Sequence, residues 1–274
     1  MSSSPSSLSS SGPKDQAEAP GGGQAPPLIS YRGVDKAFGS NVVLQGIDLD
    51  VYEGETLVIL GRSGSGKTVM TSMLVGLTLP DQGSITVGGL EITEFKSDSD
   101  WRDLRLKSGY LFQGSALYDS MSVGENVAFP MVQHTGWSLE EMARRVHEKL
   151  AQVGLEETEA MEPGELSGGM LRRAALARSL ALDPQIIIYD EPTAGLDPIT
   201  GDEIGHLIRR LQKTLKVTSI VVTHDLRLTE LVADRLTLLY QGGTVFLGTY
   251  EEFLQSSHPE VRRFLHEPPE EKPE

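Results

Sequence analysis

Residues 61–68 read Gly-Arg-Ser-Gly-Ser-Gly-Lys-Thr, and this stretch decides the fold. An apolar, β-branched run precedes it at 56–60, and apolar residues at helical spacing follow it from Met70 to Leu77. A strand, a glycine-rich loop and a helix in this order form a P-loop, in which backbone N–H groups cradle phosphates at a helix N-terminus. A chance match in a flexible loop is the alternative, and the flanking strand and helix argue against it. We therefore expect an α/β protein that binds a nucleoside triphosphate.

Two side chains of this loop are expected to act on the nucleotide. Lys67 reaches the β- and γ-phosphates, and the hydroxyl of Thr68 binds Mg²⁺. The other loop residues that we expect to contact the phosphates are Gly61, Ser63, Gly64, Ser65 and Gly66.

The composition limits the possible classes of function. The 274-residue chain has a formal net charge of −15, whereas a nucleic-acid-binding protein presents a basic face, so we expect no nucleic-acid partner. It contains no cysteine, which excludes disulfides, a thiol nucleophile and cysteine-bound metal. No apolar run approaches the ~20 residues that span a bilayer. A role at a membrane would therefore be peripheral or depend on a partner.

The two ends of the chain have the composition of solvated tails. Residues 1–27 are rich in Ser, Gly and Pro with almost no large apolar side chains, so we expect a disordered tail. They lack the hydrophobic region of a secretory signal. A transit peptide remains the alternative, although no arginine precedes Arg32 and Asp15 and Glu18 are acidic. Residues 267–274 form a second charged, Pro-rich end.

Between these ends, strands and helices alternate. Strands are predicted at 29–38, 42–51, 84–87, 90–92, 107–113, 185–191, 219–223, 235–240 and 244–247. Helices are predicted after residue 68, over 138–153, over 167–182, through 204–211 and over 259–265, with helical structure throughout 114–165. This alternation favours a largely parallel sheet with right-handed crossovers. The glycines near 88 and 242 indicate hairpins, and Ser138 with Glu141 predicts a capping box.

Polar residues end three of the predicted strands. Asp190 follows a buried-type strand, the position from which a carboxylate holds Mg²⁺ in P-loop proteins. Glu191 would then face the γ-phosphate and polarise the attacking water. Gln113 and His224 end two further strands, and parallel sheets place ligand groups at their carboxyl ends. Each of these residues taken alone has an alternative without catalysis. Asp190 and Glu191 could be a solvated acidic pair, and His224 could simply lie beside a helix N-terminus.

Residues 167–169, Ser-Gly-Gly, form a second glycine-rich helix start. A helix N-terminus attracts anions, so one chain would hold a single P-loop and two phosphate-binding ends. A tight turn before the helix is the alternative. Phe38 precedes a turn cluster at 39–41 and is expected to be exposed, either as a ligand contact or as an ordinary edge residue.

Taken together, these motifs resemble those of ABC-transporter ATPase subunits in order and spacing. The resemblance covers about 28–253 and rests on 61–68, Gln113, 166–169, 186–191, 195–198 and His224. It implies ATP and Mg²⁺ as ligands and a P-loop NTPase fold with a mostly parallel sheet, an antiparallel β subdomain and an inserted helical subdomain at about 114–165. The ATPase domain would span 28–257, with a short helix and charged tail at 258–274.

The resemblance also implies a head-to-tail homodimer with two ATP molecules at its interface. Each ATP would contact the P-loop of one subunit and Ser167, Gly168 and Gly169 of the other. Phe38 would stack on adenine and Asp197 would lie in the interface loop. Gln113 would link Mg²⁺ and the attacking water to the helical subdomain, and His224 would sense the γ-phosphate. Glu191, His224, Gln113 and Lys67 are thus the expected catalytic residues, and Thr68, Gln113 and Asp190 the expected metal ligands.

A narrower resemblance concerns the transported molecule. Residues 111–130, Met170 after Leu-Ser-Gly-Gly, and 261–265 are similar to the ATPases of Mla/Mce phospholipid-transport systems. This implies an ATP-hydrolysing subunit at the cytoplasmic face of the inner (plasma) membrane. Its partners would be an integral-membrane permease, an Mce-type lipid-binding protein and a small regulatory subunit.

Two alternatives stay open: an ABC ATPase for a different substrate, and a soluble ABC ATPase scaffold outside transport. Residues 114–121 are expected to form part of the dock for the permease, with Leu117 and Tyr118 as apolar anchors. The alternative is that these two side chains pack inside the helical subdomain.

Overall fold

A computed structural model describes residues 25–266; the tails predicted at 1–27 and 267–274 lie outside the described residues except for 25–27. The P-loop follows β3 (Thr56–Leu60), an inner strand of a six-stranded sheet of order β10-β9-β3-β8-β7-β6. The other strands are β6 (Ser108–Leu111), β7 (Ile186–Asp190), β8 (Thr218–Thr223), β9 (Arg235–Tyr240) and β10 (Gly243–Gly248). Neighbouring strands pair in parallel except for the antiparallel edge pair β9–β10. The predicted mostly parallel sheet is confirmed.

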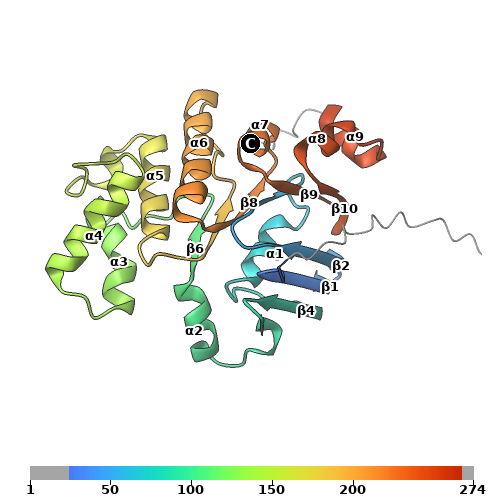
Figure 1. The fold of residues 1–274 in the computed structure, drawn as a ribbon, viewed down its shortest axis with the longest axis horizontal. Helices are drawn as coiled ribbons and strands as arrows, with labels where there is room; N and C mark the ends of the chain where they lie inside the picture. The colour runs from blue at the N-terminus through green and yellow to red at the C-terminus, as the bar shows by residue number, and fades with distance from the viewer. Residues whose placement is uncertain (1–24, 267–274) are drawn as a thin grey trace, which may run out of the picture.

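A second, antiparallel sheet covers one face of the first. It has the order β2-β1-β4-β5 and comprises β1 (Ile29–Phe38), β2 (Asn41–Val51), β4 (Gln82–Val87) and β5 (Leu90–Glu91). Figure 1 shows these strands beside α1 (Lys67–Met73), on the opposite side of the molecule from α3 and α4. This sheet is the antiparallel β subdomain that the resemblance implied.

The alternation of side chains along β3 explains how one strand serves two cores. Leu57 and Ile59 pack in the core between the two sheets, whereas Val58 and Leu60 pack in the core beneath the helices. Successive side chains of a strand point to opposite faces, so an uninterrupted apolar run such as 56–60 fits a strand that is covered on both sides. All five residues of β3 are buried.

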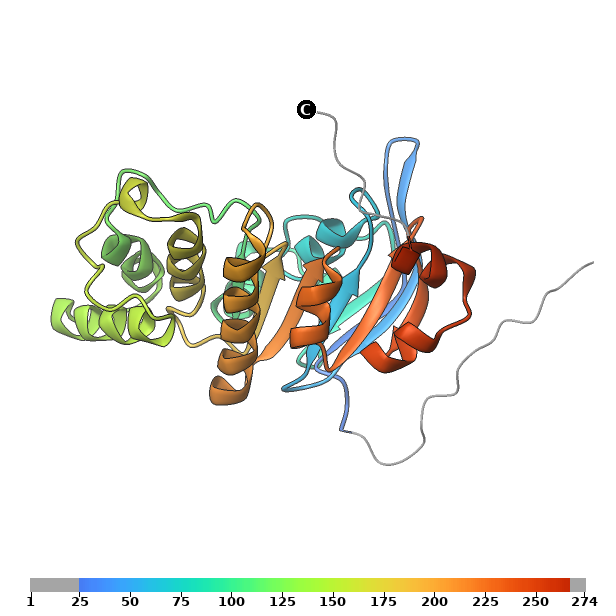
Figure 2. The ribbon, with the colours of Figure 1, turned by 90° about the horizontal axis from the view of Figure 1, so that it is seen from above.

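Helices cover the other face and form a lobe at one end (Figures 1 and 2). The lobe contains α3 (Val123–His134), α4 (Leu139–Gln152) and α5 (Gly168–Ser179), with a 3₁₀ turn at Pro163–Glu165. The remaining helices are α2 (Asp98–Leu106), α6 (Pro198–Leu215), α7 (Leu226–Val232), α8 (Tyr250–Gln255), α9 (Pro259–His266) and the 3₁₀ turn Ile92–Glu94. In residues 25–266, no helix is both long and apolar enough to cross a membrane.

Several local predictions need correction. Residues 114–122 are not helical; Ser115 and Ala116 have φ values of 62° and 51°, which are incompatible with a right-handed helix. Ser138 does cap α4 by accepting from the backbone N–H of Glu141. The carboxylate of Glu141, however, accepts from Arg144 and Arg145, so the predicted reciprocal capping box does not form.

Two element ends also differ from the predictions. Strand β6 ends at Leu111, so Gln113 lies two residues beyond it rather than at its end. Helix α5 ends at Ser179, three residues before the predicted end at 182.

The last helix packs on the body of the protein. Val261 is fully buried, and the ring of Phe264 lies 6.4 Å from that of Phe253, edge to face. Phe253 also contacts Phe246 of β10 at 5.2 Å between ring centroids. The apolar face predicted for 259–265 is therefore the face that attaches α9 to α8 and β10.

Candidate active site

The glycines of the P-loop have conformations that other residues avoid. Gly64 and Gly66 have φ values of 80° and 103°, in the left-handed region that favours glycine. A Cβ on Gly66 would lie 2.8 Å from Leu44 Cδ2 and 2.9 Å from the carbonyl oxygen of Val43. Helix α1 begins directly after Gly66, with no side chain capping its first N–H groups. Such uncapped N–H groups are suited to binding phosphate.

Lys67 is held along this loop. Its Nζ donates to the carbonyl oxygens of Gly61 at 2.7 Å and Arg62 at 3.0 Å, and lies 3.6 Å from Glu191 Oε1. Burial lowers the pKa of Lys67, and the charge of Glu191 opposes that shift. The nearby hydroxyl of Ser65 is buried and has no hydrogen-bond partner. A buried cation and an unsatisfied hydroxyl at a helix start fit a phosphate group.

Thr68 and Asp190 meet across the first turn of α1. Thr68 Oγ1 donates to Asp190 Oδ1 at 3.2 Å. Burial raises the pKa of Asp190, and the hydrogen bond from Thr68 opposes this shift. A carboxylate beside a hydroxyl supplies the oxygen donors that Mg²⁺ prefers, so the two residues fit the predicted metal site.

Tyr110 is a neighbour of this pair that the sequence analysis did not single out. Its hydroxyl lies 3.1 Å from Thr71 Oγ1 and 3.5 Å from Asp190 Oδ2. Burial raises the pKa of Tyr110 to about 12, so the hydroxyl stays protonated at neutral pH. Nothing in the local pattern at 108–111 distinguishes this tyrosine from an ordinary strand residue.

Glu191 is the centre of a hydrogen-bond network. Its carboxylate lies 3.0 Å from His224 Nδ1 and accepts from Thr223 Oγ1 at 3.3 Å. Burial alone would raise the pKa of Glu191, but the hydrogen bond to His224 and the charge of Lys67 lower it below its usual value. The carboxylate is therefore ionised at neutral pH, the state that a general base requires.

The backbone of Glu191 is unusual for its residue type, because its φ of 47° lies in the left-handed region. Its N–H donates to the carbonyl oxygen of Val222 at 2.9 Å. This bond, together with the side-chain bonds, holds the residue in a conformation that costs energy and that clusters at functional sites.

His224 pairs with Glu191, and this gives a pH-dependent prediction. The hydrogen bond to Glu191 raises the pKa of His224 above 6.5 despite partial burial. The stabilising contribution of the pair is therefore complete below pH 6.5 and is lost as the pH rises through the raised pKa of His224. The melting temperature of wild type should exceed that of His224→Asn by more at pH 6 than at pH 9, without added nucleotide.

The control for this experiment is His206→Asn, which changes an exposed histidine on α6. A difference between wild type and His224→Asn that is the same at both pH values would contradict the assigned pair.

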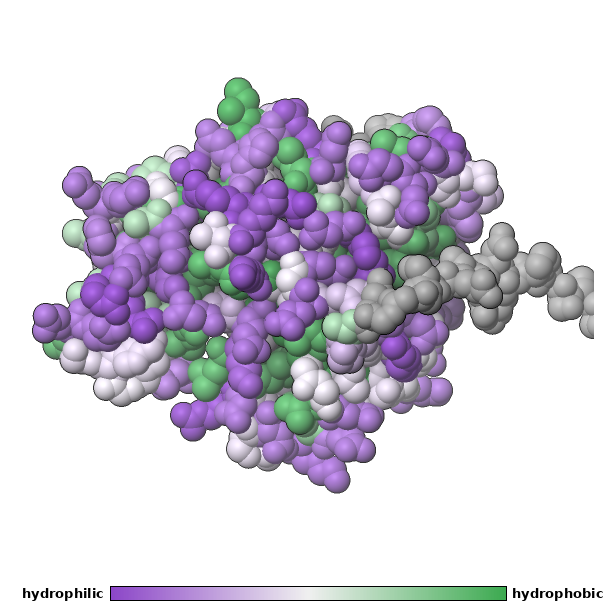
Figure 3. Space-filling model, viewed as in Figure 1, coloured by the Kyte–Doolittle hydropathy of each residue, from purple (hydrophilic) through white to green (hydrophobic). Residues whose placement is uncertain are grey.

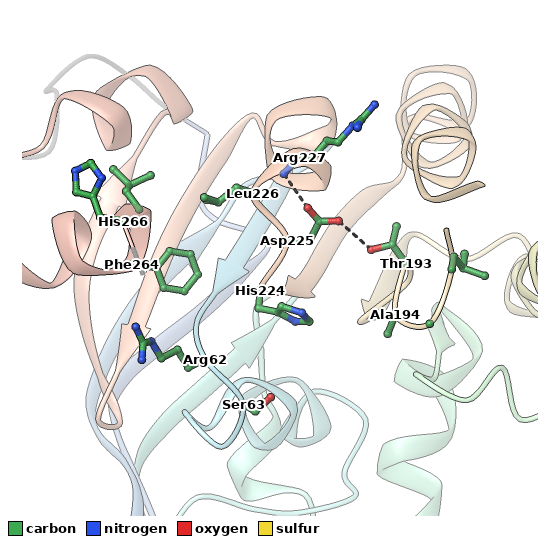
Figure 4. Close-up of a pocket in the computed structure, with 13 residues that line it drawn as sticks. Arg62, Ser63, Thr193, Ala194, His224, Asp225, Leu226, Arg227, Phe264 and His266 are labelled. Carbon is green, nitrogen blue, oxygen red and sulfur yellow. Dashed lines mark hydrogen bonds between the residues drawn. The ribbon is translucent and has the colours of Figure 1, made fainter. Parts of the chain in front are cut away.

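A cavity of about 820 Å³ opens beside these residues. His224 projects into it between the loop that carries Ser63 and the loop that carries Thr193 and Ala194 (Figure 4). Helix α9 contributes Phe264, Leu265 and His266 to the wall. The sequence predicted helix α9 but not its place in the cavity wall. The amphipathic pattern of 259–265 was the only feature that pointed to a buried face on this helix.

The second glycine-rich helix start does not itself line this cavity. Ser167 is exposed and caps α5 by accepting from the N–H of Met170 at 3.3 Å. A Cβ on Gly169 would lie 2.6 Å from Thr200 Cγ2, so only glycine allows α5 to approach the start of α6 this closely. None of residues 167–169 is among the described residues that line the 820 Å³ cavity.

Asp197 and Phe38 are also exposed. Asp197 caps α6 by accepting from the N–H groups of Ile199 and Thr200, both at 3.1 Å. Phe38 ends β1, and 52% of its surface is accessible. Neither residue lines the cavity among the described residues. The structure therefore brings together Lys67, Thr68, Asp190, Glu191 and His224, whereas 167–169, Asp197 and Phe38 lie outside the cavity.

Gln113 is likewise exposed. Its carbonyl oxygen accepts from Arg172 Nη1 at 2.5 Å, but within residues 25–266 its side-chain amide makes no hydrogen bond. Its predicted roles at the metal and at water stay predictions.

Known proteins are similar to this chain in sequence and in fold. The ABC transporter family model matches residues 44–194. The probable ribonucleotide transport ATP-binding protein mkl of Mycobacterium leprae is 41% identical over 237 residues, covering 86% of this chain and 68% of its own length. The intermembrane phospholipid transport system ATP-binding protein MlaF of Haemophilus influenzae is 40% identical, covering 87% of this chain and 90% of its own.

Among solved structures, the dimeric ATP-binding cassette MJ0796, bound to ADP and Pi in a post-hydrolysis state, superimposes with a TM-score of 0.74. It is 31% identical to this chain and covers 81% of it and 98% of its own length.

Proposed function

This chain belongs to the ABC transporter family and is an ATP hydrolase, and we propose that it powers phospholipid transport through a separate membrane-spanning permease. The observation that carries the lipid assignment is its 40% identity to MlaF across 90% of that protein. The run at 111–130 and Met170, which resemble Mla/Mce ATPases, support the same assignment.

The residues around Glu191 suit ATP hydrolysis. Lys67 would bind the β- and γ-phosphates, and Thr68, Asp190 and Gln113 would hold Mg²⁺, which would neutralise phosphate charge in the transition state. The ionised carboxylate of Glu191 orients the attacking water and accepts its proton. His224 fixes Glu191 by the 3.0 Å hydrogen bond and would contact the γ-phosphate.

We further propose that two copies assemble head to tail around two ATP molecules. The exposure of Ser167, Gly168 and Asp197 supports this, because each would be available to a second copy. Ile199, two residues after Asp197 in the first turn of α6, is 74% exposed although it is large and apolar. In this dimer Phe38 stacks on adenine.

The permease is proposed to dock between the helical lobe and α2. A groove of about 900 Å³ lies there, lined by residues of α2, β6, α3, α5 and the 112–118 loop. Phe112 and Tyr118 line it and are 40% and 45% exposed. The face drawn in Figure 3 is largely hydrophilic with small hydrophobic patches. The exposed apolar side chains of the groove are therefore the candidates for contact with the permease.

A buried side chain of α3 holds the 112–118 loop at this groove. Asn126 is buried and accepts from the N–H of Tyr118 while donating to its carbonyl oxygen. Leu117 instead packs against the core of the helical lobe. The hypothesis that Leu117 is a docking anchor is therefore withdrawn, and Tyr118 retains that role.

We expect Tyr118→Ser to weaken permease binding on the order of tenfold or more, because exposed tyrosines at interface centres commonly cost ~1–4 kcal/mol when truncated. Retention of the permease on pull-down and the melting temperature are measured together. Leu254→Ser is the matched control, since Leu254 is 44% exposed on α8, outside the groove. Full retention of the permease by Tyr118→Ser would contradict docking at this groove.

The transported molecule can be tested by purifying the complex from detergent-solubilised membranes. We expect a membrane-spanning permease and phospholipid to co-purify, along with an Mce-type lipid-binding protein and a small regulatory subunit. The protein would then act as a peripheral subunit at the cytoplasmic face of the inner membrane.

One observation favours ribonucleotides as an alternative substrate: the mycobacterial relative is named for ribonucleotide transport. This chain spans about two thirds of that relative's length. A purified complex that contains a permease, lacks phospholipid and binds ribonucleotides on the permease would contradict the lipid assignment. Absence of any membrane partner would favour a scaffold instead.

A further inference from the structure

Arg172 is a buried arginine that no step above uses. Only 5% of its surface is accessible. Its Nη1 donates to the carbonyl oxygens of Phe112 at 3.1 Å and Gln113 at 2.5 Å, and its Nη2 donates to that of Ala194 at 3.1 Å. One guanidinium therefore joins α5 to two loops that lie 60 and 22 residues away in sequence.

The environment of Arg172 is unfavourable for a cation. Within residues 25–266 it forms no ion pair, burial lowers its pKa, and its Nε–H is buried without a hydrogen-bond partner. Burying a charge without an opposite charge is costly, and a leucine or methionine could fill similar space without that cost. The carbonyl contacts identify what the guanidinium does: it fixes the two loops.

Two arginines of α5 hold the first part of the first loop. Arg178, on the same helix, donates to the carbonyl oxygens of Ser115 at 3.0 Å and Ala116 at 2.7 Å. Two arginines thus hold four carbonyl oxygens within residues 112–116. The loop does not follow regular secondary structure, and Ser115 and Ala116 have left-handed backbones, so its position depends on these contacts.

The second loop leads from Glu191 to Asp197, and it also packs on α5. A Cβ on Gly168 would lie 3.4 Å from Leu196 Cδ2, and the close approach of Gly169 to Thr200 is described above. Arg172 extends this contact inward to Ala194. Helix α5 therefore contacts the 191–197 loop in two places: at the surface through Gly168, and in the interior through the guanidinium of Arg172.

We propose that Arg172 is a positioning residue that makes the Gln113 loop, the start of α5 and the Asp197 loop move as one unit. This rests on the proposed dimer, in which Gln113 acts in one ATP site while 167–169 of the same chain act in the other. A displacement of Gln113 in one site is carried through Arg172 to the helix start that completes the second site. Arg172 thereby couples the two sites of the dimer.

The test compares Arg172→Lys and Arg172→Gln with Arg173→Gln. Lysine keeps the charge but cannot span three carbonyl oxygens on two loops. Arg173 is the neighbouring arginine on α5, and it pairs with Glu203 on the surface. We expect the Hill coefficient for ATP hydrolysis, at most 2 for two sites, to fall toward 1 in both Arg172 variants. We also expect kcat to fall on the order of tenfold, with ATP affinity of the monomer unchanged.

A second measurement does not depend on the dimer. Amide hydrogen exchange of the nucleotide-free monomer should increase at both 112–116 and 193–197 in Arg172→Lys, and at neither segment in Arg173→Gln. Suppose that exchange is faster in both segments of Arg172→Lys but that the wild type never dimerises. This result would support the role of Arg172 in holding the two loops and would contradict the proposed dimer.

Three outcomes would overturn the inference. One is unchanged exchange in the two loops of Arg172→Lys. Another is a lower melting temperature of Arg172→Lys with wild-type cooperativity and kcat, which would assign Arg172 a purely structural role. The third is an equal loss of cooperativity in Arg173→Gln, which would assign the effect to α5 in general.

Discussion

Glu191→Gln is expected to lower steady-state ATP turnover by about two orders of magnitude or more, because a positioned general base contributes roughly 10²–10⁴-fold. The amide has the shape of the carboxylate but cannot accept the proton of the attacking water. Lys67, Thr68 and Asp190 are unchanged, so ATP binding should persist. With hydrolysis stopped, MgATP should hold the protein as a closed dimer, which light scattering measures with and without MgATP.

Glu140→Gln is the control, because Glu140 is an exposed glutamate in the first turn of α4, in the lobe away from the cavity. ATP turnover near that of wild type in Glu191→Gln would contradict the role of Glu191. A loss of turnover accompanied by a loss of ATP binding would show instead that the substitution disturbs the network of Lys67 and His224.

Complementation between Lys67→Ala and Ser167→Arg is the second large expected effect. Each variant alone should hydrolyse almost no ATP, because Lys67→Ala removes the cation from both phosphate sites and Ser167→Arg blocks both opposing helix starts. In a mixed dimer, one site carries both changes and the other carries neither. An equal mixture should therefore recover roughly a quarter of wild-type single-turnover hydrolysis, since half of the dimers are mixed and each has one intact site.

Ser167 is a helix N-cap, so its replacement also costs about 1 kcal/mol of stability. Ser138→Arg, at the N-cap of α4, is the matched control for this loss and should not impair hydrolysis. Mixed dimers that form but recover no single-turnover hydrolysis would contradict the head-to-tail arrangement, as would hydrolysis by Ser167→Arg alone.

Much of the fold was predictable because the relevant signals are local. The run at 56–60 and the following glycine-rich loop predicted β3, the P-loop and α1, and the glycine pairs at 88–89 and 242–243 predicted two hairpins that the structure confirms. The prediction of helix over 114–122 was wrong, because Asn126 and Arg178 impose a different backbone there. The periodicity of a sequence segment does not reveal hydrogen bonds from residues that lie outside the segment, such as Asn126 and Arg178.

The sequence by itself determined which strand-end residues lie beside the P-loop. Parallel strands end at one edge of a sheet, so residues that follow the strands, such as Asp190 and His224, had to converge near the P-loop. Only the tertiary structure decided that Leu117 faces inward, that α9 lines the cavity and that Arg172 joins two loops. In the last case the acceptors are backbone carbonyl oxygens, which every residue carries, so no side-chain pattern could have identified them before the chain was folded.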